Sequence, residues 1–331
     1  SSSSSSSSTS SHCGATMMLA DGFFRSVAPN CFTPSLRIRE MDEQGIQVQV
    51  LSTVPIMFSY WAKPEDCADL SRYLNDSLAS VVSEHPSRFL GLGTLPMCDT
   101  DLAIKEARRI ITSLGLRGVQ IGSHVDLADG SKRMLSDPAF DPLWAELERL
   151  GASVFVHPWD MLGKPVMEKY WLPWLVGMPM ETSLAISSLL FSGVFERYPR
   201  LRFAFAHGGG NFPATIGRIQ HGFDCRPDLC AVDCTTPPRD FLGHFWIDSL
   251  VHDPAVLRYC ADLLGSDKIC LGTDYPFPLG EVPPLKMPGD VIREAYPDDK
   301  RTQAKMLGQN CLDFLGMTEE DIRGKGADDE L

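Results

Sequence analysis

The sequence has 331 residues, of which 44% are apolar and 22% are charged, so the chain is long enough to bury a large core. Its 30 basic and 43 acidic residues give a net charge of −13, which argues against broad nucleic-acid binding because that needs a basic surface. The sequence shows no run of roughly 18 consecutive apolar residues, and its ten cysteines are spread along the whole length. We therefore expect a globular cytoplasmic protein with no membrane or nucleic-acid partner.

The chain begins with an unusual segment. Residues 1–11 are serine except for Thr9, and such a tract buries no apolar surface, so we expect disorder over residues 1–20. The first residue is Ser1 rather than methionine, which indicates a processed product, a fragment or a gene model with a faulty first exon; we favour the last two. Residues 21–317 are expected to form one domain, and 318–331 a charged, frayed tail.

From Phe32 onward, short β-branched or apolar runs alternate with longer helical patterns. In chain order, the expected strands are 47–52, 89–94, 118–122, 153–157, 202–207, 245–248 and 268–273. The expected helices are 33–45, one beginning at 64, then 101–114, 141–150, 180–198, 253–265 and 300–315. This alternation predicts an α/β fold with a parallel sheet, and seven units are close to the eight of a TIM barrel. A dinucleotide-binding fold is less favoured, because no glycine-rich phosphate motif follows a strand.

The expected strands end in polar residues, which are Ser52-Thr53, Thr94, Ser123-His124, His157, His207, Asp248 and Thr273-Asp274. In a TIM barrel these ends converge on the face that carries the active site. Two imidazoles and a carboxylate suit a divalent metal with an open coordination position, which would acidify a bound water. Taken singly, each histidine could be a core residue bonded to backbone, and Asp274 a turn or helix-cap residue.

Four stretches carry a more specific signal, namely LRIREMD (36–42), MFSYWAKPED (57–66), KYWLPWLVGMP (169–179) and GTDYPFPLG (272–280). Through them the chain, from about Phe24 to about Leu315, resembles the 2-amino-3-carboxymuconate-6-semialdehyde decarboxylases, zinc enzymes of the amidohydrolase superfamily. The resemblance implies a TIM (β/α)8-type barrel and a Zn²⁺-dependent, non-oxidative decarboxylation that yields 2-aminomuconate 6-semialdehyde. In that family the reaction belongs to the kynurenine branch of tryptophan catabolism and diverts carbon from quinolinate and NAD synthesis.

The resemblance also implies roles for single residues. His157 and Asp274 match zinc ligands, and His207 matches the histidine that activates the zinc-bound water. His207 and Asp274 are therefore the expected catalytic residues.

Four further residues match substrate-binding positions of the family. Arg25 matches an arginine that grips a substrate carboxylate, while Trp174 and Phe277 match aromatic residues near the substrate. Arg218 matches an arginine that reaches into the neighbouring subunit's site, which implies a homodimer. Two arginines would give a dicarboxylate substrate the positive contacts that a chain of charge −13 otherwise lacks.

The sequence departs from the family at its beginning. The family starts with a strand that carries His-x-His, and both histidines bind zinc; here the only histidine before His85 is His12, which has no partner two residues away. We therefore expect a barrel that lacks its first strand, with poor zinc binding and little activity. We hypothesise that the natural protein carries an upstream His-x-His segment, and a full transcript without one in frame with Phe24 would refute this.

Two alternatives to the zinc decarboxylase stay open. The first is a catalytically impaired paralogue or isoform, or a truncated gene model, that acts as a dimer partner. The second is a related amidohydrolase-type decarboxylase or hydrolase that acts on another carboxylate.

Overall fold

The computed structural model describes residues 14–19 and 22–323, which divide into two compact units at the boundary between Gln47 and Val48. The serine tract at 1–11, His12 and residues 324–331 of the expected tail lie outside the described residues. The boundary falls inside the range 21–317 that the sequence predicts as one domain.

The first unit contains a hairpin and a helix. Strand β1 (Ala15–Leu19) pairs antiparallel with β2 (Gly22–Val27), and helix α1 (Pro34–Gln44) follows. Gly45 caps the C-terminus of α1 with a left-handed φ of 70°, which agrees with the expected end of this helix at residue 45. Strand β1 lies within residues 1–20, where composition predicts disorder. The backbone of β1 is ordered by its pairing with β2, and amino-acid composition gives no information about such pairing.

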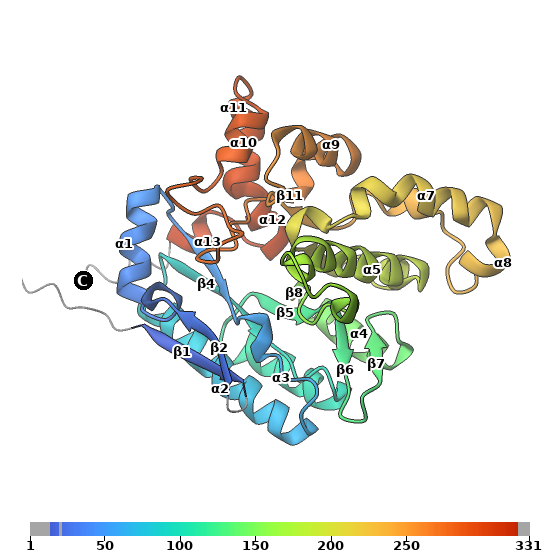
Figure 1. Ribbon diagram of the computed structural model, residues 1–331, viewed down its shortest axis with the longest axis horizontal. Helices are drawn as coiled ribbons and strands as arrows, with labels where there is room; N and C mark the ends of the chain where they lie inside the picture. Colours follow the sequence, from blue (N-terminus) through green and yellow to red (C-terminus); the bar gives the residue numbers. More distant parts are fainter. Residues whose placement is uncertain (1–13, 20–21, 324–331) are drawn as a thin grey trace, which may run out of the picture. The chain divides into compact units, whose positions relative to one another are not determined.

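The second unit is built on a curled parallel sheet of seven strands surrounded by helices (Figure 1). Its strands are β3 (Gln49–Ser52), β4 (Phe89–Thr94), β5 (Gly118–Gly122), β8 (Ser153–His157), β9 (Arg202–Phe205), β10 (Trp246–Asp248) and β11 (Ile269–Cys270). They lie side by side in chain order, with β3 and β11 at the two edges. The seven strands expected from the sequence are therefore confirmed, and so is the barrel-type α/β fold.

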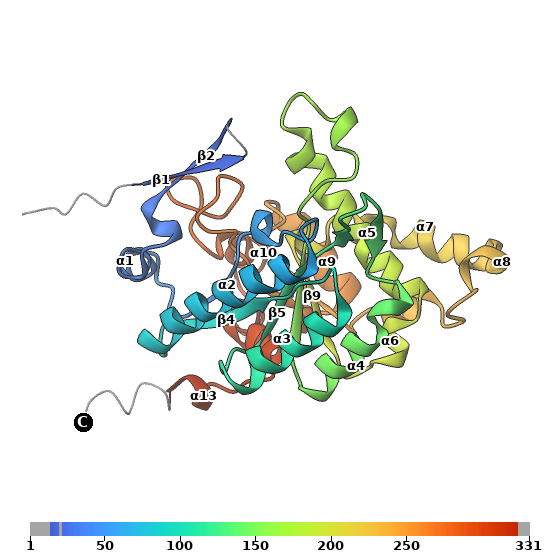
Figure 2. The same cartoon turned by 90° about the horizontal axis from the view of Figure 1, so that it is seen from below.

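Helices connect successive strands. The longer ones are α2 (Pro64–Glu84), α3 (Thr100–Thr112), α4 (Asp141–Arg149), α5 (Met178–Phe191), α7 (Phe212–Cys225) and α9 (Pro254–Leu264). Shorter helices are α6 (Val194–Arg197), α8 (Pro227–Cys230), α10 (Asp290–Ala295), α11 (Lys300–Ala304), α12 (Asn310–Leu315) and α13 (Glu320–Arg323). Figure 2 shows α2, α3 and α4 running side by side along the sheet.

Several details differ from the expected helices and strands, and β11 covers only Ile269–Cys270 of the expected strand 268–273. The expected helix 180–198 is divided into α5 and α6, because Gly193 adopts a left-handed φ of 73°. Helix α7 was not expected, nor was a small hairpin of β6 (His124–Asp126) and β7 (Lys132–Met134) that follows β5. Each strand of that hairpin has three residues, too few to show a two-residue periodicity.

The alternation of side chains along each strand separates two cores. On β8, Val154 and Val156 belong to the larger core, which includes buried residues of the surrounding helices. Phe155 belongs to a smaller core with Trp246 of β10 and Phe314 of α12. His157 shares the face of Phe155, because side chains two residues apart point to the same side of a strand.

One helical stretch, Pro173–Phe191, is long and apolar enough by length and composition to cross a membrane. The core helix of a globular protein passes the same test, so this is weak support for a span. Ala185, Ile186, Leu189 and Leu190 of α5 are buried in the larger core.

Candidate metal centre

Four polar residues lie at or beyond the carboxyl ends of four adjacent strands. His157 is the last residue of β8 and Asp248 the last of β10, while His207 follows β9 and Asp274 follows β11. Because β8, β9, β10 and β11 are neighbours in a parallel sheet, their carboxyl ends lie close together on the same side of the sheet.

Three of the four form a cluster. His157, His207 and Asp274 each offer a ligand atom, and these atoms all lie within 4.8 Å of one another. The two imidazole rings meet edge to face, with centroids 4.9 Å apart and an interplanar angle of 79°. All three residues are partly buried. Two ring nitrogens and a carboxylate oxygen are a donor set that Zn²⁺ and similar divalent ions prefer.

Both histidines are held in the neutral form that ligates metals. Burial lowers the pKa of His157 to about 3, and the neighbouring His207 adds to the effect. Burial likewise lowers the pKa of His207 to about 4, with a smaller contribution from His252. Nδ1 of His157 lies 2.6 Å from the carbonyl oxygen of Pro158, so it carries the proton and Nε2 keeps its lone pair. The residues therefore fit a divalent metal ion.

The motif His-Gly-Gly-Gly folds into a tight turn. His207 to Gly210 all have positive φ values (58°, 64°, 73° and 62°), and the Gly210 N–H donates to the His207 carbonyl oxygen at 2.9 Å. A Cβ atom on Gly210 would lie 2.1 Å from the Pro179 carbonyl oxygen, and one on Gly208 would lie 2.2 Å from Cγ1 of Val251. Glycine is needed at these positions because the turn packs directly against α5 and the segment after β10.

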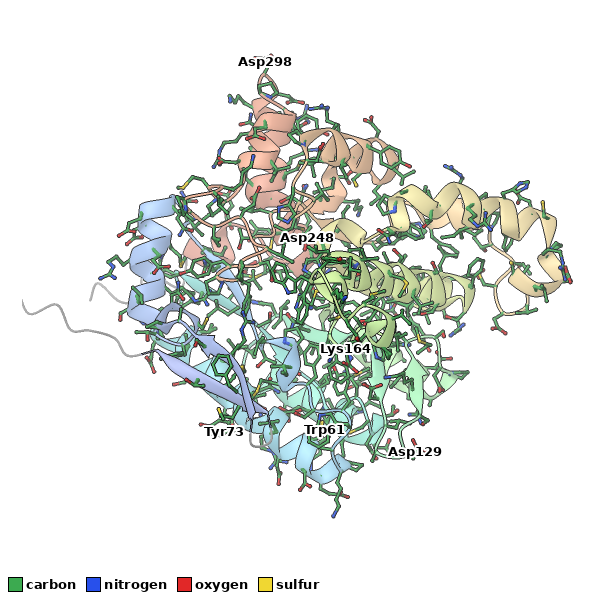
Figure 3. The ribbon with its side chains drawn as sticks, viewed as in Figure 1. Trp61, Tyr73, Asp129, Lys164, Asp248 and Asp298 are labelled. Carbon is green, nitrogen blue, oxygen red and sulfur yellow. The ribbon has the colours of Figure 1, made fainter. Side chains whose placement is uncertain are left out.

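Asp248 is buried next to this turn. Figure 3 labels its position in the second unit. Its carboxylate accepts hydrogen bonds from the backbone N–H groups of His207 and Gly208, both at 2.8 Å, and of Leu250 at 3.0 Å. Burial raises the pKa of Asp248, and these three hydrogen bonds oppose that rise. Sequence reasoning noted Asp248 only as a polar strand end and gave it no role.

Asp274 begins a compact loop and has a φ of 49°. The Phe277 N–H donates to the Asp274 carbonyl oxygen at 2.8 Å, and the Glu281 N–H donates to that of Thr273 at 2.9 Å. The predicted substrate-contacting Phe277 thus belongs to the same turn as the predicted metal ligand Asp274.

A second buried polar group was not found from the sequence. Glu181 of α5 is 1% exposed, and its carboxylate accepts from the Ser123 hydroxyl at 2.9 Å and from the Leu162 N–H at 2.7 Å. It therefore ties α5 to the residues that follow β5 and β8. Burial raises the pKa of Glu181 and lowers that of the adjacent buried His124.

The other predicted site residues lie elsewhere on the chain. Trp174 is partly buried in the turn Pro173–Gly177, with its ring centroid 6.0 Å from that of Trp171. Arg218 is exposed on α7 and makes no hydrogen bond or ion pair with the rest of the described chain. Arg25 lies on β2 of the first unit, opposite Met17 of β1. Their roles stay predictions.

Comparison with known proteins identifies the family. The amidohydrolase family model Amidohydro_2 matches residues 15–317. The chain is 54% identical over 305 residues to 2-amino-3-carboxymuconate-6-semialdehyde decarboxylase of Dictyostelium discoideum, which covers 92% of this chain and 82% of that protein. It is 39% identical over 352 residues to the Caenorhabditis elegans protein of the same name, covering 92% and 86%.

A solved structure supports the same assignment. The 5-carboxyvanillate decarboxylase from Sphingomonas paucimobilis superposes with a TM-score of 0.74 at 26% identity, over 86% of this chain and 83% of that one. The chain therefore belongs to the amidohydrolase family and, within it, to the decarboxylases that include the 2-amino-3-carboxymuconate-6-semialdehyde decarboxylases.

Proposed function

We propose that the protein catalyses the non-oxidative decarboxylation of 2-amino-3-carboxymuconate 6-semialdehyde to 2-aminomuconate 6-semialdehyde in the cytosol, in the kynurenine branch of tryptophan breakdown. The supporting observation is the cluster of His157, His207 and Asp274 in a chain 54% identical to a decarboxylase of that name.

His157 and Asp274 would hold Zn²⁺, which when bound supplies Lewis acidity. His157 needs no deprotonation to bind it, because its Nδ1 proton is committed to the Pro158 carbonyl oxygen and Nε2 is already free of a proton. When CO2 leaves, the electron pair of the broken C–C bond stays on the substrate carbon, and a proton must take the place of CO2. A ring nitrogen of neutral His207 is the group that would hold and move that proton.

The substrate's two carboxylates would be bound by Arg25 and by Arg218, the latter from a second copy of the chain. Arg218 suits this role because it is exposed and has no partner elsewhere in the described residues. Exposed apolar side chains of α5 and of the segment Pro173–Gly177 before it, namely Leu175, Val176, Met180 and Leu184, offer a surface for that second copy. Trp174 and Phe277 would pack against the conjugated substrate.

The test combines zinc content per subunit with release of CO2 from 2-amino-3-carboxymuconate 6-semialdehyde. Near-stoichiometric zinc together with turnover would support the proposal and would refute the expectation of poor zinc binding that follows from the absent His-x-His. Bound zinc without turnover would contradict the substrate assignment and favour a related enzyme, for which 5-carboxyvanillate is a suitable comparison substrate. Little zinc would favour the catalytically impaired alternative, in which the chain acts as a dimer partner.

A further inference from the structure

The backbone at His207 has a conformation that needs support. Its φ of 58° lies in the left-handed region, which a residue with a Cβ atom adopts only at an energetic cost. The three residues after it are glycines, which adopt positive φ values freely. His207 is therefore the only residue of this turn whose positive φ is energetically unfavourable.

The Asp248 carboxylate is shaped to give that support. Oδ2 accepts from the His207 N–H, while Oδ1 accepts from the N–H groups of Gly208 and Leu250. A tight turn can bring two successive N–H groups to the same side, as it does here at His207 and Gly208, and a carboxylate can accept from both at once.

We propose that Asp248 is a positioning residue, which holds the backbone of His207 in its left-handed conformation and thereby directs the imidazole toward His157 and Asp274. For catalysis the inference rests on the proposed function, but the conformational claim does not. Asp248 belongs to β10 and His207 follows β9, so the contact also links the ends of two adjacent strands.

The substitution Asp248→Asn tests the proposal sharply. Asparagine has the same shape but one acceptor oxygen, so no orientation of its amide accepts from both His207 and Gly208 as the two carboxylate oxygens do. The matched control is Asp253→Asn. Asp253 caps α9 by accepting from Ala255 and Val256, and both bonds end on the single oxygen Oδ1, which asparagine retains.

The first readout is the NMR spectrum of the His207 ring in the full chain without added metal. We expect Asp248→Asn to shift and broaden the His207 ring signals while leaving those of His85 and His221 unchanged, and Asp253→Asn to change none of them. The second readout is steady-state kinetics, where displacement of the ring should lower kcat about 100-fold with KM changed less than about threefold.

If Asp248→Asn folds poorly, a double-mutant cycle of unfolding free energies tests the proposal instead. Glycine at position 207 adopts the left-handed conformation without support. Asp248→Asn should therefore lower the free energy of unfolding much less in the His207→Gly background than in the wild type. The proposal would be overturned if Asp248→Asn lowered the free energy of unfolding equally in both backgrounds, or if it left the NMR signals of the His207 ring unchanged. A wild-type protein without decarboxylase activity would refute the proposed function. The NMR spectra and the double-mutant cycle would still test the role of Asp248, because neither depends on activity.

Discussion

The imidazole rings of His157 and His207 meet edge to face with centroids 4.9 Å apart, although each histidine lies at the end of a different strand. Burial lowers the pKa of both imidazoles, His207 lowers that of His157 further, and His252 lowers that of His207. Both imidazoles are therefore neutral, and a neutral imidazole has a ring nitrogen whose lone pair can bind a metal ion.

Replacing His157 should weaken metal binding. His157→Ala removes one of the two residues proposed to hold Zn²⁺, and we expect the affinity for Zn²⁺ to fall more than about 100-fold, since loss of residues that only support the ligands already costs about 10–100-fold. Competition with a chromogenic chelator measures this affinity. His221→Ala, an exposed histidine of α7, is the control and should bind as the wild type does. Equal affinities for all three proteins would exclude His157 as a ligand.

Arg218 should matter for activity and hardly at all for stability. Arg218→Ala removes an exposed side chain that has no partner in the described part of the chain, so we expect the free energy of unfolding to change by less than about 0.5 kcal/mol. If Arg218 binds a substrate carboxylate, kcat/KM should fall about tenfold or more. Arg226→Ala, which removes an exposed arginine paired with Asp228, is the control. Unchanged kcat/KM in Arg218→Ala would remove the arginine from the site.

The turn after β9 should tolerate no side chain at Gly210. Gly210 and Gly151 have nearly equal φ values, 62° and 63°, but a Cβ on Gly210 would lie 2.1 Å from the Pro179 carbonyl oxygen whereas Gly151 has nothing within 4 Å. Gly151→Ala should therefore cost about 1–2 kcal/mol for its backbone conformation alone. Gly210→Ala should cost about 1–3 kcal/mol more, because its ψ of −132° lies outside the left-handed helical region and its Cβ would meet the Pro179 carbonyl oxygen. Urea unfolding measures both, and similar losses would show that the turn can move away from α5.

Glu146 should contribute to stability in a pH-dependent way. Its carboxylate accepts hydrogen bonds from Arg149 and Arg108, which hold the pKa of Glu146 at about 2, below its ordinary value of 4.5. A lowered folded-state pKa means that this stabilisation is complete above about pH 4.5 and is lost as the pH falls toward about 2.

Glu146→Gln should remove that dependence. Because both arginines are largely exposed, we expect the variant to lose only about 1 kcal/mol at neutral pH. Thermal unfolding from pH 2 to pH 7 compares the two proteins, and the difference between them should shrink as the pH falls. A difference that stays constant over this range would contradict the ion-pair explanation.

Much of the fold can be predicted from local patterns. Strand β8 is a short apolar run ended by His157, and α9 begins at an Asp-Pro pair, where Asp253 caps the helix as expected. Such signals depend on neighbours in the sequence. The hairpin of β6 and β7 carries no such signal, because its short strands are defined by pairing with each other.

Local sequence patterns suffice to predict the seven strands in their order, the polar residues at their ends and the family of the chain. Three contacts appear only in the folded chain: the approach of His157, His207 and Asp274 to within 4.8 Å, the bond of Asp248 to the backbone of His207, and the link that Glu181 makes between α5 and two loops. Sequence patterns miss these contacts because periodicity and helix caps act between residues close in sequence. Convergence of strand ends and burial of a carboxylate instead depend on the curl and register of the whole sheet.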